Sequence, residues 1–369
     1  MGCLASPLTD YMEVPAPVAA ARFNELSAFL CGPCGEGQRC GGCRAGARPK
    51  TLAFVHRSQL TSETMSSREV HVIELPFDGF GRAGHQAGAS VTYRAAGLME
   101  HPVIEMHSTE AMLLPVSSTD RGSVTGLLNE AALFAAIDSS ASAVSSSLSV
   151  GGFPIVVGGD CSVLVGIFGG AHATDESFGL LFIDGHEDTT PLDVVEDGEA
   201  ANTELGLLLG LTGRMPTYPR PQLTGTLTPE RLASVGMRDH DFRRQANIGS
   251  VADLGAFYRS AEDARKSPSR AGQDAAAHLA GGPWWMHVDL DVLDPTELPA
   301  TLVPGETEQE PGGLTWNELT ALMTTAAATG ECRGLSVAIY DPEQDPAGMY
   351  PPRIVALIHD VLSATLASR

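Results

Sequence analysis

Short apolar runs alternate with amphipathic stretches along most of this chain. The apolar runs lie at residues 70–75, 154–157, 178–183, 233–237, 284–289 and 334–340. Apolar runs of this length are typical of strands that are buried on both faces of a parallel sheet. We therefore predict a strand at each of these positions.

Between the apolar runs, apolar residues recur at helical spacing. The longest such face extends from Val124 to Leu148 and predicts one long helix packed against the sheet. Further helices are predicted after Cys161 and at residues 88–98, 199–211, 257–279, 319–329 and 354–367. Thr315 and Glu318 form a capping box at the start of one of them. Because strands and helices alternate, we expect an α/β protein, a three-layer α/β/α sandwich around a mainly parallel sheet.

Residues 1–69 differ from the rest and form a predicted Cys-, Gly- and Pro-rich, flexible N-terminal extension before a domain at 70–369. Two C-x-x-C pairs at 31–43 can hold a zinc ion, but only five residues separate them, so a glycine-rich extension without metal is the other interpretation. Gly2 and Cys3 fit a pattern for N-terminal acylation, and Met65 is an alternative start of translation.

Composition narrows the class of protein. The 23 basic and 45 acidic residues give a net charge of -22, which argues against a nucleic-acid-binding face and favours a cationic small molecule as ligand. No apolar run approaches the ~20 residues of a membrane-spanning helix. Five of the seven cysteines lie before residue 44, so the main domain is poor in cysteine and its expected location is the cytoplasm.

Three of the predicted strands end in residue types that bind metals. Alternate side chains of an extended segment point the same way, and the ligand sites of open α/β sheets lie at the carboxyl ends of the strands. The candidate ligands at these ends are Asp184, His186, Asp188, Asp289, Asp291 and Cys161. One aspartate can bind a different ion with each oxygen, so Asp184 and Asp289 can bridge two ions. The set predicts a two-metal site that makes hydroxide from water.

The same motifs, in this order, resemble those of the ureohydrolase family, which comprises arginases and agmatinases. GGDCS at 158–162 resembles the family pattern G-G-D-H-S, DGHED at 184–188 resembles D-A-H-x-D, and HVDLDVLDP at 287–295 resembles S-x-D-x-D-x-x-D-P. The segments at 235–238 and 311–315 are similar to the family's G-x-R strand and P-G-G-L-[ST] helix start. The resemblance identifies residues 70–369 as an arginase-like metallohydrolase domain.

The resemblance implies a ligand set and a reaction. Cys161, Asp184, Asp188 and Asp289 are expected to hold one divalent ion, and the second is expected at His186, Asp184, Asp289 and Asp291. A metal-bridging hydroxide is expected to hydrolyse a linear C–N bond of a guanidino or amidino compound, with Asp294 orienting the site. Carboxylate-rich ligation favours Mn²⁺. Family members form trimers or hexamers, so a homo-oligomer is expected.

Three departures from the family pattern bear on metal and substrate. Cys161 replaces a ligand histidine, and a thiolate shifts the preference towards Ni²⁺, Co²⁺ or Zn²⁺, whereas an inert buried thiol would weaken the site. Ile339 stands where arginases have the glutamate that holds the guanidinium, so Asp341 and His85 are the candidate substrate contacts. Ala201 stands where arginases have a proton-shuttling histidine, and Glu199 is the candidate to replace it.

These departures favour a substrate other than arginine. The competing interpretation is a non-catalytic arginase-like paralogue whose weakened metal site serves a binding or regulatory role. A one-zinc deacetylase of the same superfamily is disfavoured by the second acid pair and by the PGGLT segment at 311–315.

Overall fold

The computed structural model describes residues 69–195, 198–211, 219–302 and 310–367. The chain divides into two units, Met1–Thr64 and Met65–Arg369, and every described residue belongs to the second. The predictions for Gly2, Cys3, the cysteine pairs at 31–43 and Met65 lie outside the described residues.

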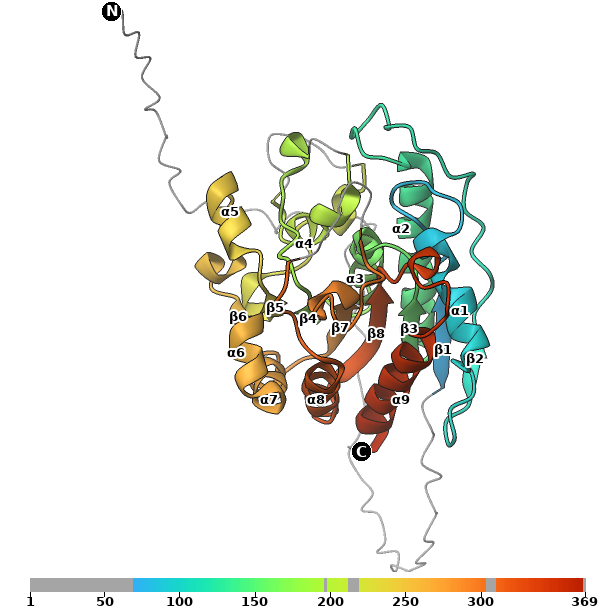
Figure 1. Cartoon of the computed structure of the whole chain (residues 1–369), viewed down its shortest axis with the longest axis vertical. Helices are drawn as coiled ribbons and strands as arrows, with labels where there is room; N and C mark the ends of the chain where they lie inside the picture. The colour runs from blue at the N-terminus through green and yellow to red at the C-terminus, as the bar shows by residue number, and fades with distance from the viewer. Residues whose placement is uncertain (1–68, 196–197, 212–218, 303–309, 368–369) are drawn as a thin grey trace, which may run out of the picture. The chain divides into compact units, whose positions relative to one another are not determined.

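One parallel sheet organises the described part of the chain (Figure 1). Its eight strands have the order β2-β1-β3-β8-β7-β4-β5-β6, and every pairing between neighbours is parallel. The predicted α/β fold class is therefore confirmed. The strands are β1 Val70–Glu74, β2 Met106–Ser108, β3 Phe153–Val157, β4 Gly179–Ile183, β5 Leu232–Met237, β6 Phe257–Ser260, β7 Trp284–Asp289 and β8 Cys332–Ala338.

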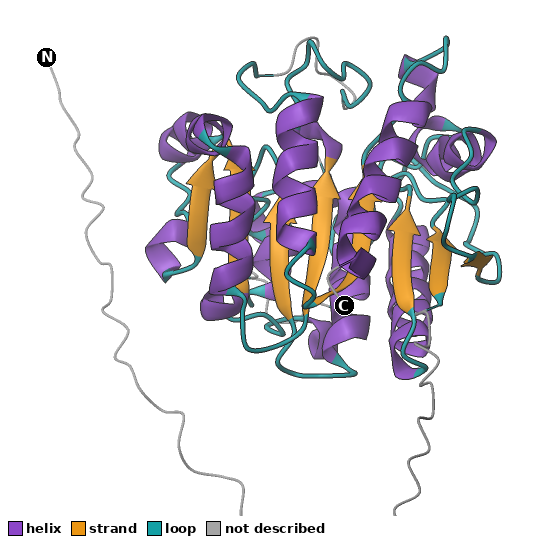
Figure 2. Cartoon of the chain, turned by 90° about the horizontal axis from the view of Figure 1, so that it is seen from below, coloured by secondary structure: helices purple, strands orange, loops and turns teal. Residues whose placement is uncertain are grey.

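Helices cover both faces of the sheet (Figure 2). The core on one face contains residues of α1 Ala89–Ala95, α6 Ala261–Lys266, α7 Pro268–His278, α8 Trp316–Ala327 and α9 Pro351–Ala367. The core on the other face contains residues of α2 Glu130–Ser149, α3 Leu164–His172 and α4 Glu204–Leu208, and helix α5 spans His240–Ala246. Short 3-10 helices lie at η1 His85–Gly88, η2 Cys161–Val163, η3 Leu192–Val194, η4 Ala200–Asn202, η5 Pro221–Leu223, η6 Pro229–Arg231, η7 Val251–Leu254, η8 Leu290–Val292 and η9 Pro342–Gln344.

Alternation along the central strands explains the two cores. In β4, Leu181 and Ile183 belong to the first core, whereas Leu180 and Phe182 belong to the second. All four side chains are fully buried. Successive side chains of a strand point to opposite faces, so a central strand covered on both sides must be apolar at every position.

The two edge strands β2 and β6 were not predicted from the sequence. The prediction of a helix over 257–279 is wrong at its start, because Phe257–Ser260 pairs with β5 and the helix begins after Ser260, whose hydroxyl accepts the N–H of Asp263. The helix predicted over 199–211 is limited to Glu204–Leu208, after a 3-10 turn. The long helix starts at Glu130, and Val124, predicted to face the core, is exposed. The capping box of Thr315 and Glu318 is confirmed.

Helix α2 is long and apolar enough, by length and composition, to cross a membrane. Of its most apolar stretch, 39% is buried within the structure. The buried side chains of α2, among them Leu133, Ile137 and Val144, belong to the core that α3 shares. This packing is typical of a core helix in a globular domain.

Candidate metal centre

Cys161 follows β3 through a turn that requires glycine. Gly158 and Gly159 have φ values of 85° and 81°, which a residue with a side chain adopts only with strain. A Cβ at Gly159 would also lie 3.2 Å from the carbonyl oxygen of Leu75. Asp160 then caps η2, because its carboxylate accepts the N–H of Ser162 at 2.9 Å. The turn buries the Cys161 thiol, whose Sγ lies 3.5 Å from the carbonyl oxygen of Ala201.

Asp184 lies at the end of β4 and is fully buried. Its Oδ1 accepts the N–H of His186 at 2.7 Å, whereas its Oδ2 has no hydrogen-bond partner among the described residues. Gly185 lies between them, and a Cβ there would clash with the guanidinium of Arg238. Asp188 has a φ of 42°, an uncommon conformation for a residue with a side chain. Local backbone geometry therefore places Asp184 and Asp188 at the carboxyl end of β4.

The end of β7 provides the second acid pair. Asp289 accepts the N–H of Asp291 at 3.0 Å and so caps η8. Asp291 reaches back to the segment after β4, where its Oδ1 accepts the N–H of Gly185 at 3.0 Å. Its Oδ2 lies 2.8 Å from Nδ1 of His186. β4 and β7 are neighbours in the sheet, and these contacts of Asp291 join the carboxyl ends of the two strands.

The structure brings the six predicted ligands together in three groups. Within each group, one ligand atom from each residue lies within 4.8 Å of the others. The groups are Cys161 with Asp188 and Glu204, Asp184 with His287 and Asp289, and Asp184 with His186 and Asp291. Of the two predicted bridging residues, Asp184 belongs to two groups and Asp289 to one.

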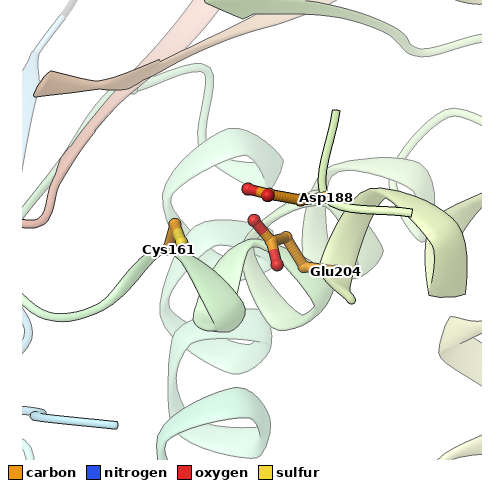
Figure 3. Close-up of side chains that lie close together, drawn as sticks. All are labelled: Cys161, Asp188 and Glu204. Atoms are coloured by element: carbon orange, nitrogen blue, oxygen red, sulfur yellow. The ribbon is translucent and has the colours of Figure 1, made fainter. Parts of the chain in front are cut away.

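Glu204 was not predicted, although the structure places it beside two predicted ligands. It is the first residue of α4, and Figure 3 shows its carboxylate directed towards Cys161 and Asp188. The available signal was an acidic residue directly before the apolar segment at 205–209, in a helix expected to pack in the core.

His287 is the second residue that sequence reasoning missed. Its ring stacks on Phe182 with 5.5 Å between centroids, and its Nδ1 lies 2.7 Å from Oγ of Ser336. Its Nε2 has no partner among the described residues. Burial lowers the pKa of His287 to about 3, so the imidazole is neutral. The available signal was its position two residues before Asp289, on the same face of the strand.

The cluster contains more acids than its surroundings can satisfy as anions. Burial, followed by the neighbouring carboxylates, raises the pKa of Asp184 and Asp289 well above their ordinary range. Burial and Glu204 do the same for the pKa of Asp188. Burial is also the main reason why the pKa of Glu204 and of the Cys161 thiol is raised. Each of these groups favours its neutral form until a positive charge enters the site.

His186 and Asp291 form the exception, as an ion pair. Burial lowers the pKa of His186, but the charge and hydrogen bond of Asp291 outweigh it and raise this pKa to about 10. Burial raises the pKa of Asp291, but His186 and Arg238 outweigh it and hold this pKa below its ordinary value.

The donor set fits divalent cations. Buried ligand atoms without a hydrogen-bond partner among the described residues occur in three side chains of the cluster, namely Asp184 Oδ2, Glu204 Oε1 and His287 Nε2. Buried polar atoms are nearly always paired, so such orphans point to a missing partner. A cation would satisfy these atoms and offset the charge of the carboxylates.

Asp294 and Glu199 have other partners in the structure. Asp294 accepts hydrogen bonds from the N–H and hydroxyl of Thr296 and from the N–H of Gly312, at 3.0, 2.6 and 2.8 Å. It therefore holds the segment before α8 in place. Glu199 lies directly before η4 and is 9% exposed, and its Oε2 accepts a hydrogen bond from Asn202 at 3.2 Å.

The two predicted substrate contacts are paired with each other. His85 Nδ1 lies 2.8 Å from Oδ2 of Asp341, which is fully buried. Gln344 donates to the same oxygen, and the N–H of Glu343 donates to the other. Ile339, in the position of the arginase glutamate, is buried and has a φ of 64°. A β-branched residue at such a φ is a genuine outlier.

Comparisons with known proteins identify the family of the chain and its fold. The model of the arginase family matches residues 68–363. The chain is 26% identical to the arginase of Eremothecium gossypii over 325 residues, which cover 82% of this chain and 76% of that protein. It is 26% identical to arginase-1 of Homo sapiens over 310 residues, which cover 82% and 92%.

Two solved structures have the same fold. The arginase of Bacillus caldovelox superposes with a TM-score of 0.67 at 21% identity, covering 80% of this chain and 98% of that one. The proclavaminate amidino hydrolase of Streptomyces clavuligerus superposes with a TM-score of 0.61 at 19% identity, covering 82% and 93%.

Proposed function

Because the chain belongs to the arginase family, we propose that it is a metal-dependent hydrolase of a linear C–N bond in a guanidino or amidino compound. The observation that carries the proposal is the convergence of acids, an imidazole and a thiol at the ends of β3, β4 and β7. Arginases and amidino hydrolases are among its relatives and structural neighbours.

We propose that the centre holds two divalent cations. One lies at the end that contains Cys161 and Asp188, and the other at the end that contains His186 and Asp291, with Asp184 and Asp289 between them. When bound, the cations make a water molecule a nucleophile at neutral pH and offset the negative charge that develops on the substrate. Mn²⁺ is the expected ion, with Ni²⁺, Co²⁺ and Zn²⁺ as alternatives because of Cys161.

The side chains of this chain have separate tasks in the proposal. Asp291 fixes the ring of His186 through its 2.8 Å contact and so sets which nitrogen faces the centre. Arg238 donates to the carbonyl oxygen of Asp291 at 2.6 Å and fixes that residue in turn. Glu199 is the proposed proton donor to the departing amine. Asp294 keeps the 312–315 segment in place beside the end of β7.

The substrate is proposed to differ from arginine. Ile339 offers no charge for a guanidinium, and both oxygens of Asp341 already accept hydrogen bonds from protein groups. The oxygen of Asp341 that faces His85 is the proposed contact for an amidinium or guanidinium, which would take the place of the imidazole. Such an exchange favours a compact cation over a long amino-acid side chain.

The test combines metal content with a substrate screen. Purified protein is incubated with Mn²⁺, Ni²⁺, Co²⁺ or Zn²⁺, and bound ions are counted by elemental analysis in the wild type, Asp184→Asn and Cys161→Ser. We expect close to two ions per chain and release of urea or ammonia from at least one guanidino or amidino compound. Bound ions without turnover would favour the non-catalytic paralogue. Ile339 and Ala201 support that alternative, because they replace the substrate glutamate and the proton-shuttling histidine of arginases. No bound ion under any condition would exclude the hydrolase.

A further inference from the structure

We infer that Glu204 is a ligand of the ion at Cys161 and Asp188, so that this end of the centre is a thiolate and carboxylate site. The inference rests on the proposed function and assigns a residue outside the motifs of the family pattern. Cys161, Asp188 and Glu204 are all buried, and their ligand atoms lie within 4.8 Å of one another. They come from η2, from the segment after β4 and from α4, and Figure 3 shows the three side chains converging.

Glu204 has an oxygen that accepts no hydrogen bond from an N–H or hydroxyl group of the described protein, and its side-chain neighbour is the carboxyl of Asp188. The side chain is 0% exposed, and its Oε2 accepts the N–H of Thr203 at 3.2 Å. Its Oε1 has no hydrogen-bond partner among the described residues. Leaving a carboxylate oxygen unpaired in a protein interior is costly. A ligand role accounts for this oxygen, because a cation completes its coordination.

Backbone hydrogen bonds hold Glu204 beside Asp188 independently of the protonation of the two carboxyls. The N–H of Gly206 donates to the carbonyl oxygen of Asp188 at 3.0 Å, and the N–H of Thr190 donates to that of Asn202 at 2.9 Å. A Cβ at Gly206 would lie 3.0 Å from Cα of Thr189, so glycine permits this close approach. These bonds do not involve the carboxylates, so the backbone itself enforces their proximity.

The two ends of the centre therefore differ in chemistry. The end at Cys161 offers one sulfur and two carboxylates, whereas the other end offers the imidazole of His186 with carboxylates only. Thiolates prefer zinc and other late divalent ions, and carboxylates prefer harder ions such as Mn²⁺. The Cys161 end is thus assigned a thiophilic divalent cation of the zinc or cobalt type.

Cobalt substitution tests the assignment without any substrate. In the Co²⁺-loaded full-length protein we expect a sulfur-to-cobalt charge-transfer band that Cys161→Ser abolishes. Glu204→Gln should keep that band, change the ligand-field bands in the visible range, and weaken Co²⁺ binding at this end by more than about 100-fold, the upper range for loss of an outer-sphere partner. Chelator competition measures the affinity. Glu176→Gln, at an exposed glutamate, should match the wild type.

The possible outcomes separate this inference from the proposed function. Unchanged ligand-field bands and Co²⁺ affinity in Glu204→Gln would overturn the ligand role, while two bound ions in the wild type would leave the hydrolase intact. A wild-type protein that binds no ion would overturn both. Circular dichroism of the metal-free variants controls for folding. If Glu204→Gln fails to fold, Glu204→Asp, which keeps the charge on a shorter side chain, provides the same spectroscopic comparison.

Discussion

The N–H of Ile339 donates a hydrogen bond of 3.0 Å to the carbonyl oxygen of Gly159, which joins the end of β8 to the turn that carries Cys161. Ile339 makes this bond at a φ of 64°, and Gly159 has a φ of 81°. Glycine tolerates such a conformation, whereas a β-branched residue is strained by about 1–3 kcal/mol. Strain is thus stored at the position where arginases have their substrate glutamate.

Ile339→Ala should therefore cost less stability than the same truncation elsewhere in the core. Ile→Ala substitutions in cores typically cost about 2–5 kcal/mol, and we expect that cost at Ile155, which lies in regular strand β3 and is fully buried. At Ile339 the cost should be about 1 kcal/mol smaller, because alanine reduces the crowding of the branched Cβ. Urea unfolding of both variants measures the difference. Equal costs at the two sites would contradict stored strain.

Ser336→Ala should destabilise the protein, because two buried side chains of the neighbouring strand β7 lose their hydrogen-bond partner. The hydroxyl of Ser336 accepts the indole N–H of Trp285 at 2.9 Å and lies 2.7 Å from Nδ1 of His287. Its removal leaves two buried groups without their partner, and we expect a loss of about 1–3 kcal/mol in the free energy of unfolding. Ser234→Ala is the matched control, since the Ser234 hydroxyl is buried on β5 and has no partner in the described residues. A similar loss at both serines would refute the role of the hydrogen bonds.

Gly185→Ala should reveal the contact between the end of β4 and Arg238. A Cβ at this position would meet the guanidinium, which is held by the carbonyl oxygens of Glu310 and Asp291 at 3.0 and 2.6 Å. We expect a cost of about 1–3 kcal/mol, typical of overpacking. In an Arg238→Ala background the cost should fall without vanishing, because the Cβ would still lie 2.9 Å from Oδ1 of Asp291, and a double-mutant cycle measures the coupling to Arg238. Gly249→Ala, where a Cβ would have open space, controls for the substitution itself.

The metal-free protein should lose stability as the pH rises above neutral. The carboxyls of Asp184, Asp188, Asp289 and Glu204 have raised pKa values when folded, against ordinary values of 3.8 for Asp and 4.5 for Glu. At these four carboxyls the folded state binds more protons than the unfolded state, so their contribution to the free energy of unfolding falls with increasing pH above those ordinary values.

His186 adds to the same trend. Its pKa is raised to about 10 from 6.5, so its contribution is complete below pH 6.5 and is lost as the pH rises through about 10. The lowered pKa values of Asp291 and His287 have the opposite sign, but Asp291 acts only below its ordinary value of 3.8 and His287 only below its ordinary value of 6.5. Thermal unfolding between pH 7 and 9, above the ordinary pKa of histidine, tests this, and bound divalent ions should flatten the dependence. A metal-free protein that becomes more stable with increasing pH would contradict the assigned charge states.

The elements that could be predicted from the sequence are those whose pattern of apolar residues reflects their burial. The central strands β3, β4 and β7 are continuous apolar runs, and each predicted ligand follows one of them, so their convergence could be inferred from the geometry of parallel sheets. The short edge strands β2 and β6 were missed because they are only partly buried and their sequence resembles that of surface segments. Edge strands depend on pairing with a neighbour, which no local pattern encodes.

Glu204 and His287 are the two residues of the cluster that could not be predicted from the sequence. Glu204 lies outside the motifs, whereas His287 stands in one of them at the position of the pattern's serine, which is no metal ligand. The position of Glu204 depends on the hydrogen bond between Gly206 and Asp188, and that of His287 on Ser336 in a strand far along the chain. Such tertiary pairings follow from the complete fold and not from the spacing of residue types.

The position of β8 in the sheet determines when the candidate metal centre can form. β8 is the last strand of the chain, yet it lies between β3 and β7, and so separates the strand before Cys161 from the strand that ends in Asp289. A chain emerging from the ribosome carries every ligand from 161 to 291 well before residues 332–338 are made. Until β8 is inserted, no strand joins β3 to β7 within the sheet. Completion of the centre therefore depends on the insertion of β8, which follows all the ligands in the sequence.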